Sequence, residues 1–174
     1  CYVPLAAEEL KDTDIKVITV VGFPLGMTSP QMKRAEADWA GANGADEIDM
    51  VINIGALKEG RYDYVKDEIS QVIAAASAHK NIVKTILETC LLTDEEILTA
   101  CRLAIEAGAA YVKTFSTSGA APHDVALIKE AVGDQILIKA SGGIRDVLTA
   151  KEMLRLGAYR LGSSSSVSIM EAWK

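Results

Sequence analysis

The chain has 174 residues, of which 49% are hydrophobic and 24% charged, and its net charge is −6. This length and composition are typical of one folded domain and exclude an intrinsically disordered chain. The acidic charge, without a basic stripe, argues against a nucleic-acid partner, and no apolar run reaches the roughly 20 residues of a membrane-spanning helix. Three scattered cysteines indicate neither a disulfide framework nor a metal site, and they predict a reduced, cytosolic protein.

Apolar strands alternate with amphipathic helices along the whole chain. The opening Cys1-Tyr2-Val3-Pro4 is typical of the end of a strand and has no initiator Met, so we expect an N-terminal piece to be missing. The predicted strands start about every 25 to 35 residues, which is the length of a βα unit. They are Ile15–Val21, Glu47–Ile52, Ile82–Leu87, Ala110–Thr114, Gln135–Lys139 and Tyr159–Gly162.

Capping residues mark the ends of the predicted helices. Ser29 and Pro30 supply an N-cap and a proline at the first helical position, and Thr93 opens a capping box. Three helices are followed by a glycine and an alanine, and glycine suits the left-handed position that ends a helix. These glycines are Gly44, Gly108 and Gly157.

Strict alternation of strands and helices permits either a doubly wound open sheet or a (β/α)₈ barrel. Two glycine- and serine-rich loops favour the barrel, since barrel phosphate sites are commonly built from the loops after strands 7 and 8. We therefore predict an α/β fold of the (β/α)8 TIM-barrel type, as a single domain over residues 1–174. A barrel of about 250 residues is typical, so the first βα unit and most of strand 2 are expected to be missing, which would leave an exposed edge.

Two lysines end successive predicted strands, at Lys113 and Lys139. A single buried lysine is more often ion-paired or extended to the rim, but two at equivalent positions on neighbouring strands would bring their ammonium groups together. Burial and mutual repulsion both favour a neutral, nucleophilic amine. The pair therefore predicts imine chemistry on a carbonyl substrate.

A carboxylate lies within the apolar strand at Asp49. Strand alternation places Glu47, Asp49 and Val51 on one face. We expect Asp49 to form an ion pair with a lysine such as Lys84, and the same carboxylate could move protons between reaction intermediates.

Two other functions fit these residues. One is a barrel phosphosugar isomerase or synthase that uses Asp49 as its base, with the lysines only binding phosphate. The other is an inactive domain that binds phosphorylated ligands.

Several segments, spread in order over the chain, resemble the deoxyribose-phosphate aldolase family of class I aldolases. They are GFPLG at 22–26, GADEIDMVIN at 44–53, YVKT at 111–114, KASGGIR at 139–145 and RLGSSS at 160–165. By this resemblance, Lys113 is the Schiff-base lysine, Lys139 perturbs it and takes part in proton transfer, and Asp49 is the proton-relay carboxylate. The implied reaction is reversible cleavage of 2-deoxy-D-ribose 5-phosphate to acetaldehyde and D-glyceraldehyde 3-phosphate. The resemblance implies no metal and no other cofactor.

The loop after Lys113 departs from the family pattern. The family usually reads Lys-Thr-Ser-Thr-Gly-Phe, whereas this chain runs Lys113-Thr114-Phe115, three residues shorter. We expect both this gap and the missing N-terminal part to be omissions from the sequence as given, since they fall in a loop and at an end.

The expected partners are a phosphosugar substrate and further copies of the chain, as a dimer or tetramer in which Trp39 or Trp173 could contribute. The predicted substrate and phosphate contacts are Gly142, Gly143, Ser164, Ser165, Thr117, Lys84 and Cys1.

Overall fold

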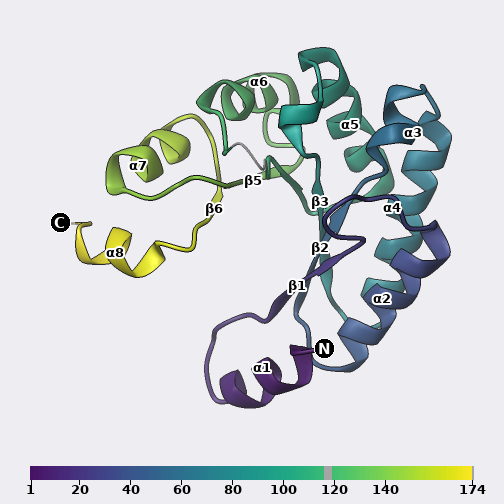
Figure 1. Ribbon diagram of the computed structural model, residues 1–174, viewed down its shortest axis with the longest axis horizontal. Helices are drawn as coiled ribbons and strands as arrows, with labels where there is room; N and C mark the ends of the chain where they lie inside the picture. Colours follow the sequence, from purple (N-terminus) through teal and green to yellow (C-terminus); the bar gives the residue numbers. More distant parts are fainter. Residues whose placement is uncertain (116–118, 174) are drawn as a thin grey trace. The chain divides into compact units, whose positions relative to one another are not determined.

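The computed structural model describes residues 1–115 and 119–173. Six strands form a sheet in chain order, β1-β2-β3-β4-β5-β6, and helices connect them (Figure 1). The pairs β1–β2, β4–β5 and β5–β6 are parallel, which confirms the predicted βα units. The strands are β1 Ile18–Val21, β2 Glu47–Val51, β3 Ile82–Ile86, β4 Tyr111–Lys113, β5 Leu137–Ser141 and β6 Arg160–Gly162. The helices are α1 Val3–Leu10, α2 Pro30–Ala42, α3 Ile54–Lys58, α4 Tyr62–Ser77, α5 Asp94–Ala107, α6 Pro122–Val132, α7 Val147–Arg155 and α8 Ser166–Glu171, with a 3₁₀ turn at Thr89–Leu91.

The chain divides into two compact units. The N-terminal unit comprises Cys1–Thr85 and Leu103–Ala110, and the C-terminal unit comprises Ile86–Arg102 and Tyr111–Lys174. Each unit contains parallel strands and the helices that cover them. The expectation of a single domain over the whole chain stays a prediction.

In the N-terminal unit, α2 and α4 lie side by side and pack on β1 and β2 (Figure 1). Their close approach is possible because α2 presents the small residues Ala37 and Ala40 at its buried face. Every residue of β2 is buried, as expected for a strand covered on both faces. Ser29 caps α2 as predicted, because its hydroxyl accepts the Met32 N–H at 3.4 Å.

In the C-terminal unit, β4, β5 and β6 carry α6 and α7 against them through apolar side chains such as Val125, Ile128 and Ile138. The predicted capping box is present where α5 begins. The Thr93 N–H donates to Glu96 Oε2 at 2.8 Å, and the Glu96 N–H donates to Thr93 Oγ1 at 3.3 Å. Gly157 follows α7 with a φ of +111°, which confirms its expected role in ending that helix.

The predicted strand end at Cys1–Pro4 is wrong. Helix α1 begins at Val3, with Pro4 in its first turn, where proline has no N–H that the helix would need. These residues are therefore no remnant of strand 2, and the first strand of the structure is β1 at Ile18.

Each strand differs from its predicted bounds by one to three residues at one or both ends, and the largest differences are at β1 and β5. Ile15 is exposed and precedes β1, and β5 continues to Ser141 rather than ending at Lys139. The extension follows from pairing, because Ala140 and Ser141 are in register with Leu161 and Gly162 of β6.

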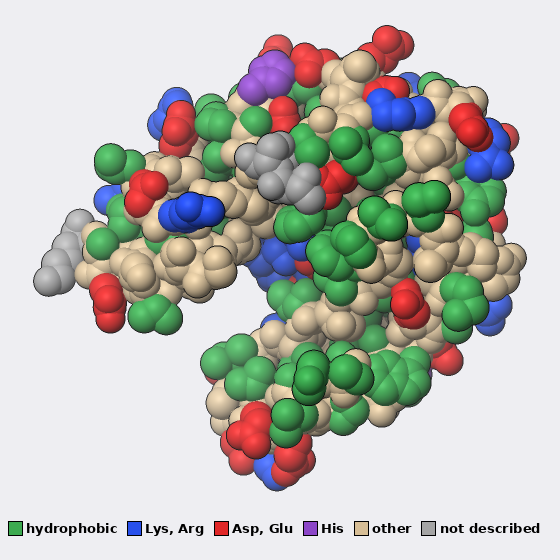
Figure 2. Space-filling model, viewed as in Figure 1, with side chains coloured by type: hydrophobic (Ala, Val, Ile, Leu, Met, Phe, Trp, Pro, Cys, Tyr) green, Lys and Arg blue, Asp and Glu red, His purple; other side chains and the backbone are tan. Residues whose placement is uncertain are grey.

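Hydrophobic side chains lie exposed around α1 and β1. Figure 2 shows hydrophobic side chains gathered over α1, and Ile18 and Val20 of β1 are 40% and 43% exposed. Because β1 is the first strand in the order of the sheet, these residues lie at an edge. The edge agrees with the exposed edge expected from the sequence. No helix among the described residues is long and apolar enough to cross a membrane.

Candidate active site

A buried lysine in the N-terminal unit contacts two carboxylates of β2. Lys84 Nζ lies 2.8 Å from Asp49 Oδ1 and 2.5 Å from Glu47 Oε2, and all three side chains are buried. The predicted Asp49–Lys84 ion pair is thus confirmed, as is the shared face of Glu47 and Asp49. Two carboxylates facing one ammonium form a buried polar cluster that could hold or release a proton.

The C-terminal unit places two lysines in register on neighbouring strands. Lys113 of β4 pairs in register with Lys139 of β5, and each side chain is 7% exposed. Residues in register on parallel strands project to the same face, with the strands about 4.8 Å apart. The two lysine side chains therefore project to the same face of the sheet from neighbouring strands. Lys113 Nζ also lies 5.2 Å from the centre of the Phe115 ring.

A third cation extends this row. Arg160 of β6 is in register with Lys139, and its guanidinium lies 5.1 Å from the ring centre of Tyr111. Three cationic residues thus occupy matching positions on β4, β5 and β6.

Two loops of the C-terminal unit meet beyond these strands. Ser163 Oγ donates to Ile144 O at 2.6 Å, and Ser165 N donates to Ser163 Oγ at 2.9 Å. The first hydrogen bond joins the loop that holds Gly142 and Gly143 to the serine-rich loop after β6, and the second lies within the serine-rich loop. Ser164 is exposed and Ser165 half-buried, so both are accessible to a ligand.

Glycine is required where the ends of β5 and β6 approach each other. A Cβ on Gly162 would lie 2.8 Å from Ser141 Cβ and 3.4 Å from Lys139 Cε. Gly142 and Gly143 have φ values of +102° and +68°, a backbone conformation that other residues rarely adopt. The backbone of β6 at Gly162 therefore lies close to Lys139, where a larger residue would meet the lysine side chain.

The remaining predicted substrate contacts are Cys1 and Thr117. Cys1 is exposed and lines a surface pocket of the N-terminal unit together with Val20, Met32 and Trp39. None of the other described lining residues of that pocket is a predicted site residue. Thr117 lies outside the described residues. Among residues 1–115 and 119–173, no group of three His, Cys, Asp or Glu side chains could hold a metal ion.

Sequence reasoning missed several polar residues. Arg160 joins the cationic row through a register that only strand pairing reveals. Ser141 is buried, and its hydroxyl has no hydrogen-bond partner among the described residues. Lys33 and Glu68 are fully buried charges on helices. Helical spacing does indicate that both residues are buried. Lys33 lies on the same face of α2 as Ala37 and Ala40, and Glu68 lies on the same face of α4 as Val65 and Val72.

The sequence matches the profile of the DeoC/LacD family aldolases over residues 5–164. A deoxyribose-phosphate aldolase of Carboxydothermus hydrogenoformans is 56% identical over 176 residues, which cover 98% of this chain and 77% of the relative. One from Caldanaerobacter subterraneus subsp. tengcongensis is 53% identical and is also covered over 77% of its length.

Solved structures give the same result. A putative deoxyribose-phosphate aldolase from Coccidioides immitis has a TM-score of 0.95 at 41% identity, covering 99% of this chain and 70% of that chain. The deoxyribose phosphate aldolase from Aeropyrum pernix, described as tetrameric, has a TM-score of 0.89 at 28% identity, covering 99% and 74%. These matches confirm the predicted α/β fold of the TIM-barrel type.

Proposed function

The chain belongs to the DeoC/LacD family of aldolases and is a carbon–carbon lyase of the deoxyribose-phosphate aldolase type, and we propose that it works through an imine on Lys113. The reaction is the reversible cleavage of 2-deoxy-D-ribose 5-phosphate to acetaldehyde and D-glyceraldehyde 3-phosphate. The single observation that carries the mechanism is the register of Lys113 with Lys139 on buried strands. The alternatives raised by the sequence, an isomerase or an inactive binding domain, have no counterpart in these relatives.

Lys113 is proposed to act as the nucleophile. Its amine adds to the aldehyde carbon of the open-chain sugar, and loss of water gives the imine. The imine draws electrons as the bond between C2 and C3 breaks and the C3 hydroxyl loses its proton, which releases D-glyceraldehyde 3-phosphate. The remaining enamine takes a proton at its methylene carbon, and water then releases acetaldehyde and restores the amine.

Lys139 is proposed to keep the Lys113 amine reactive. The side chain of Lys139 projects from the neighbouring strand to the same face of the sheet, where it can act on the Lys113 amine and take part in proton transfer. Arg160 adds a further positive charge on the next strand. The same cations suit the negative charge of the phosphosugar.

Asp49 is proposed to relay protons. The C3 hydroxyl must lose a proton and the enamine must gain one, and a buried carboxylate can do both. Asp49 Oδ1 contacts Lys84 Nζ, which Glu47 also contacts, so the carboxylate belongs to a buried polar cluster. A cluster of hydrogen-bonded polar groups supports the proposed relay.

The two joined loops are proposed to bind the phosphate. Backbone N–H groups at positive-φ glycines and near the start of a helix attract anions, and the loops carry Gly142, Gly143, Ser164 and Ser165. Roles for Thr117, Lys84 and Cys1 in substrate binding stay predictions, as does a cytosolic location.

We also propose that the chain forms homo-oligomers, as a dimer or tetramer. The Aeropyrum pernix relative is described as tetrameric, and Trp39 and Trp173 are 47% and 37% exposed here. Light scattering coupled to gel filtration measures the mass, and a monomer at micromolar concentration would contradict this proposal.

The test of the mechanism is the substitution Lys113→Ala. We expect retro-aldol cleavage, followed as release of D-glyceraldehyde 3-phosphate, to fall by about a thousandfold or more, because the substitution removes the amine that is proposed to form the imine. Lys151→Ala on the exposed surface of the same unit serves as the control and should retain activity. Substantial activity in Lys113→Ala would contradict the assignment.

A further inference from the structure

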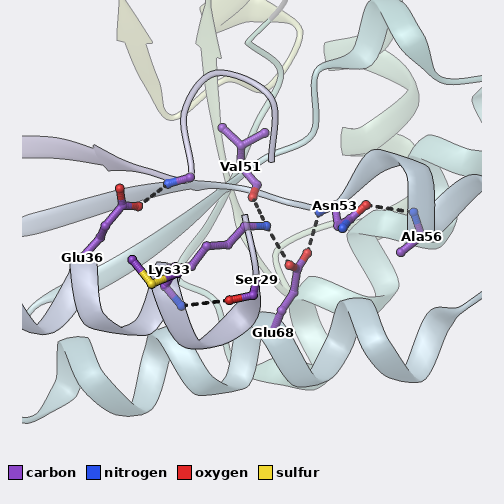
Figure 3. A network of polar contacts seen from close by, with 9 residues as sticks. Ser29, Lys33, Glu36, Val51, Asn53, Ala56 and Glu68 are labelled. Atoms are coloured by element: carbon purple, nitrogen blue, oxygen red, sulfur yellow. Dashed lines mark hydrogen bonds and ion pairs between the residues drawn. The ribbon is translucent and has the colours of Figure 1, made fainter. Parts of the chain in front are cut away.

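A second buried ion pair lies in the N-terminal unit, apart from the Lys84 cluster. Lys33 of α2 places Nζ 2.7 Å from Glu68 Oε2 of α4, and neither side chain is exposed (Figure 3). Burial lowers the pKa of Lys33 and raises the pKa of Glu68, while their mutual attraction opposes both shifts. A pair in this setting contributes little net stability, because the desolvation of both charges offsets their attraction. The role of the pair therefore follows from the groups that it binds rather than from its stabilising energy.

The pair holds the backbone at the point where β2 ends. Lys33 Nζ donates to Val51 O at 2.9 Å, and Asn53 N donates to Glu68 Oε1 at 2.5 Å (Figure 3). The two charged groups thus bind the carbonyl before Ile52 and the N–H after it. Asn53 in turn caps α3, because its Oδ1 accepts the Ala56 N–H at 2.9 Å. The exit of β2 is therefore fixed from both sides.

The loop after β1 packs on the same structure. A Cβ on Gly22, whose φ is +62°, would lie 2.8 Å from Lys33 Cε, and the Gly22 N–H donates to Glu36 Oε2 at 2.7 Å. A Cβ on Gly26 would lie 2.0 Å from Ile52 O. The backbone of this loop therefore lies close to the Lys33 side chain at Gly22 and close to the exit of β2 at Gly26.

We propose that the Lys33–Glu68 pair is a positioning device for Asp49. Asp49 precedes Val51 by two residues on β2, so a fixed carboxyl end of the strand fixes the place of its carboxylate. The inference rests on the proposed role of Asp49 as the proton relay. Lys33 and Glu68 do not touch the reacting atoms, and they act through the backbone of Val51 and Asn53. Misplacing a catalytic group by about 1 Å can cost a hundredfold in rate.

Two reactions with acetaldehyde alone separate this role from general stability. Exchange of its methyl hydrogens for deuterium in D₂O, followed by NMR, requires proton transfer to and from the enamine. Trapping of the imine by borohydride requires Lys113 but no proton transfer at the methyl carbon. In the double variant Lys33→Met/Glu68→Leu, whose apolar side chains replace the pair, we expect exchange to fall about tenfold or more while trapping stays within about twofold. A general loss of folded protein would lower both equally.

The exposed pair Lys66–Glu106 of the same unit provides the control. The double variant Lys66→Met/Glu106→Leu should exchange at the wild-type rate. If the buried double variant does not fold, Glu68→Gln takes its place, because it keeps an acceptor for Asn53 and removes the charge that holds Lys33.

Three results would overturn the inference. Wild-type exchange in a folded variant of the pair, with a loss in Asp49→Asn, overturns the positioning role alone. Equal losses of exchange and trapping assign the pair to stability only. Unchanged exchange in Asp49→Asn overturns the proposed function of Asp49, and this inference with it.

Discussion

The buried lysines of the two units have different neighbours. In the N-terminal unit, Lys33 and Lys84 each contact a carboxylate within 2.8 Å. In the C-terminal unit, Lys113 lies in register with Lys139, and Lys139 with Arg160. The first arrangement pairs each amine with a carboxylate, and the second places cationic residues in register on neighbouring strands.

The difference separates amines that hold structure from amines available for chemistry. A lysine that contacts a carboxylate donates hydrogen bonds to it, so it fixes the groups around it. A lysine that lies in register with another lysine on a neighbouring strand is the candidate nucleophile. The comparison therefore supports the proposed imine in the C-terminal unit and the proposed positioning of the carboxylate in the N-terminal unit.

The largest expected effect comes from removing the like charge beside Lys113. Lys139→Leu should lower kcat by about a thousandfold with little change in thermal unfolding, because it removes the side chain that is proposed to act on the Lys113 amine and to take part in proton transfer. Steady-state kinetics and circular dichroism measure the two quantities. Lys151→Leu, an exposed lysine of the same unit, is the matched control. Activity near that of the wild type would show that proximity of the lysines is incidental.

In the N-terminal unit the loss of a lysine should instead appear in stability. Lys84→Met leaves Glu47 and Asp49 buried without their cation, and we expect the free energy of unfolding to fall by about 3 kcal/mol. Urea denaturation measures it. Lys66→Met removes a partner from an exposed pair and should cost less than about 1 kcal/mol. Equal losses in the free energy of unfolding of the two variants would contradict the expected difference between buried and exposed ion pairs.

The smallest expected effect concerns His123, an exposed residue of the C-terminal unit that contacts a carboxylate. A hydrogen bond from His123 to Asp94, 3.1 Å long, together with their attraction, raises the pKa of His123 above its ordinary value. The stabilisation is thus complete below the unfolded pKa of His123 and is lost as the pH rises through its folded pKa.

Asp94→Ala should accordingly lower the pKa of His123 measured by NMR titration, whereas Asp134→Ala, elsewhere on the exposed surface, should leave it unchanged. A pKa of His123 that is the same with and without Asp94 would contradict the contact.

The alternation of elements was predictable because its signals are local. Ser29, Thr93 and Gly157 mark helix ends through their own side chains or their lack of one, and the structure confirms each. Asp49 and Lys84 were also predictable as a pair, since a charge inside an apolar strand needs a partner. The N-terminal helix was missed because proline is compatible both with a first helical turn and with the end of a strand.

The remaining site features depend on contacts between distant segments. Arg160 enters the cationic row only because β6 pairs with β5 in one register, and a shift by one residue would turn its side chain away. Lys33 and Glu68 are 35 residues apart, and each alone has the appearance of an ordinary surface charge on a helix. Their burial follows from the packing of α2 on α4, which sequence spacing suggests but does not establish.

The central claim is that Lys113 forms the imine. Incubation of the protein with acetaldehyde and borohydride, followed by peptide mass spectrometry, locates the reduced adduct on the chain. We predict one modified peptide, which contains Lys113, and none in Lys113→Ala. An adduct on Lys139 or another lysine, or no adduct in a protein that cleaves the phosphosugar, would contradict the account.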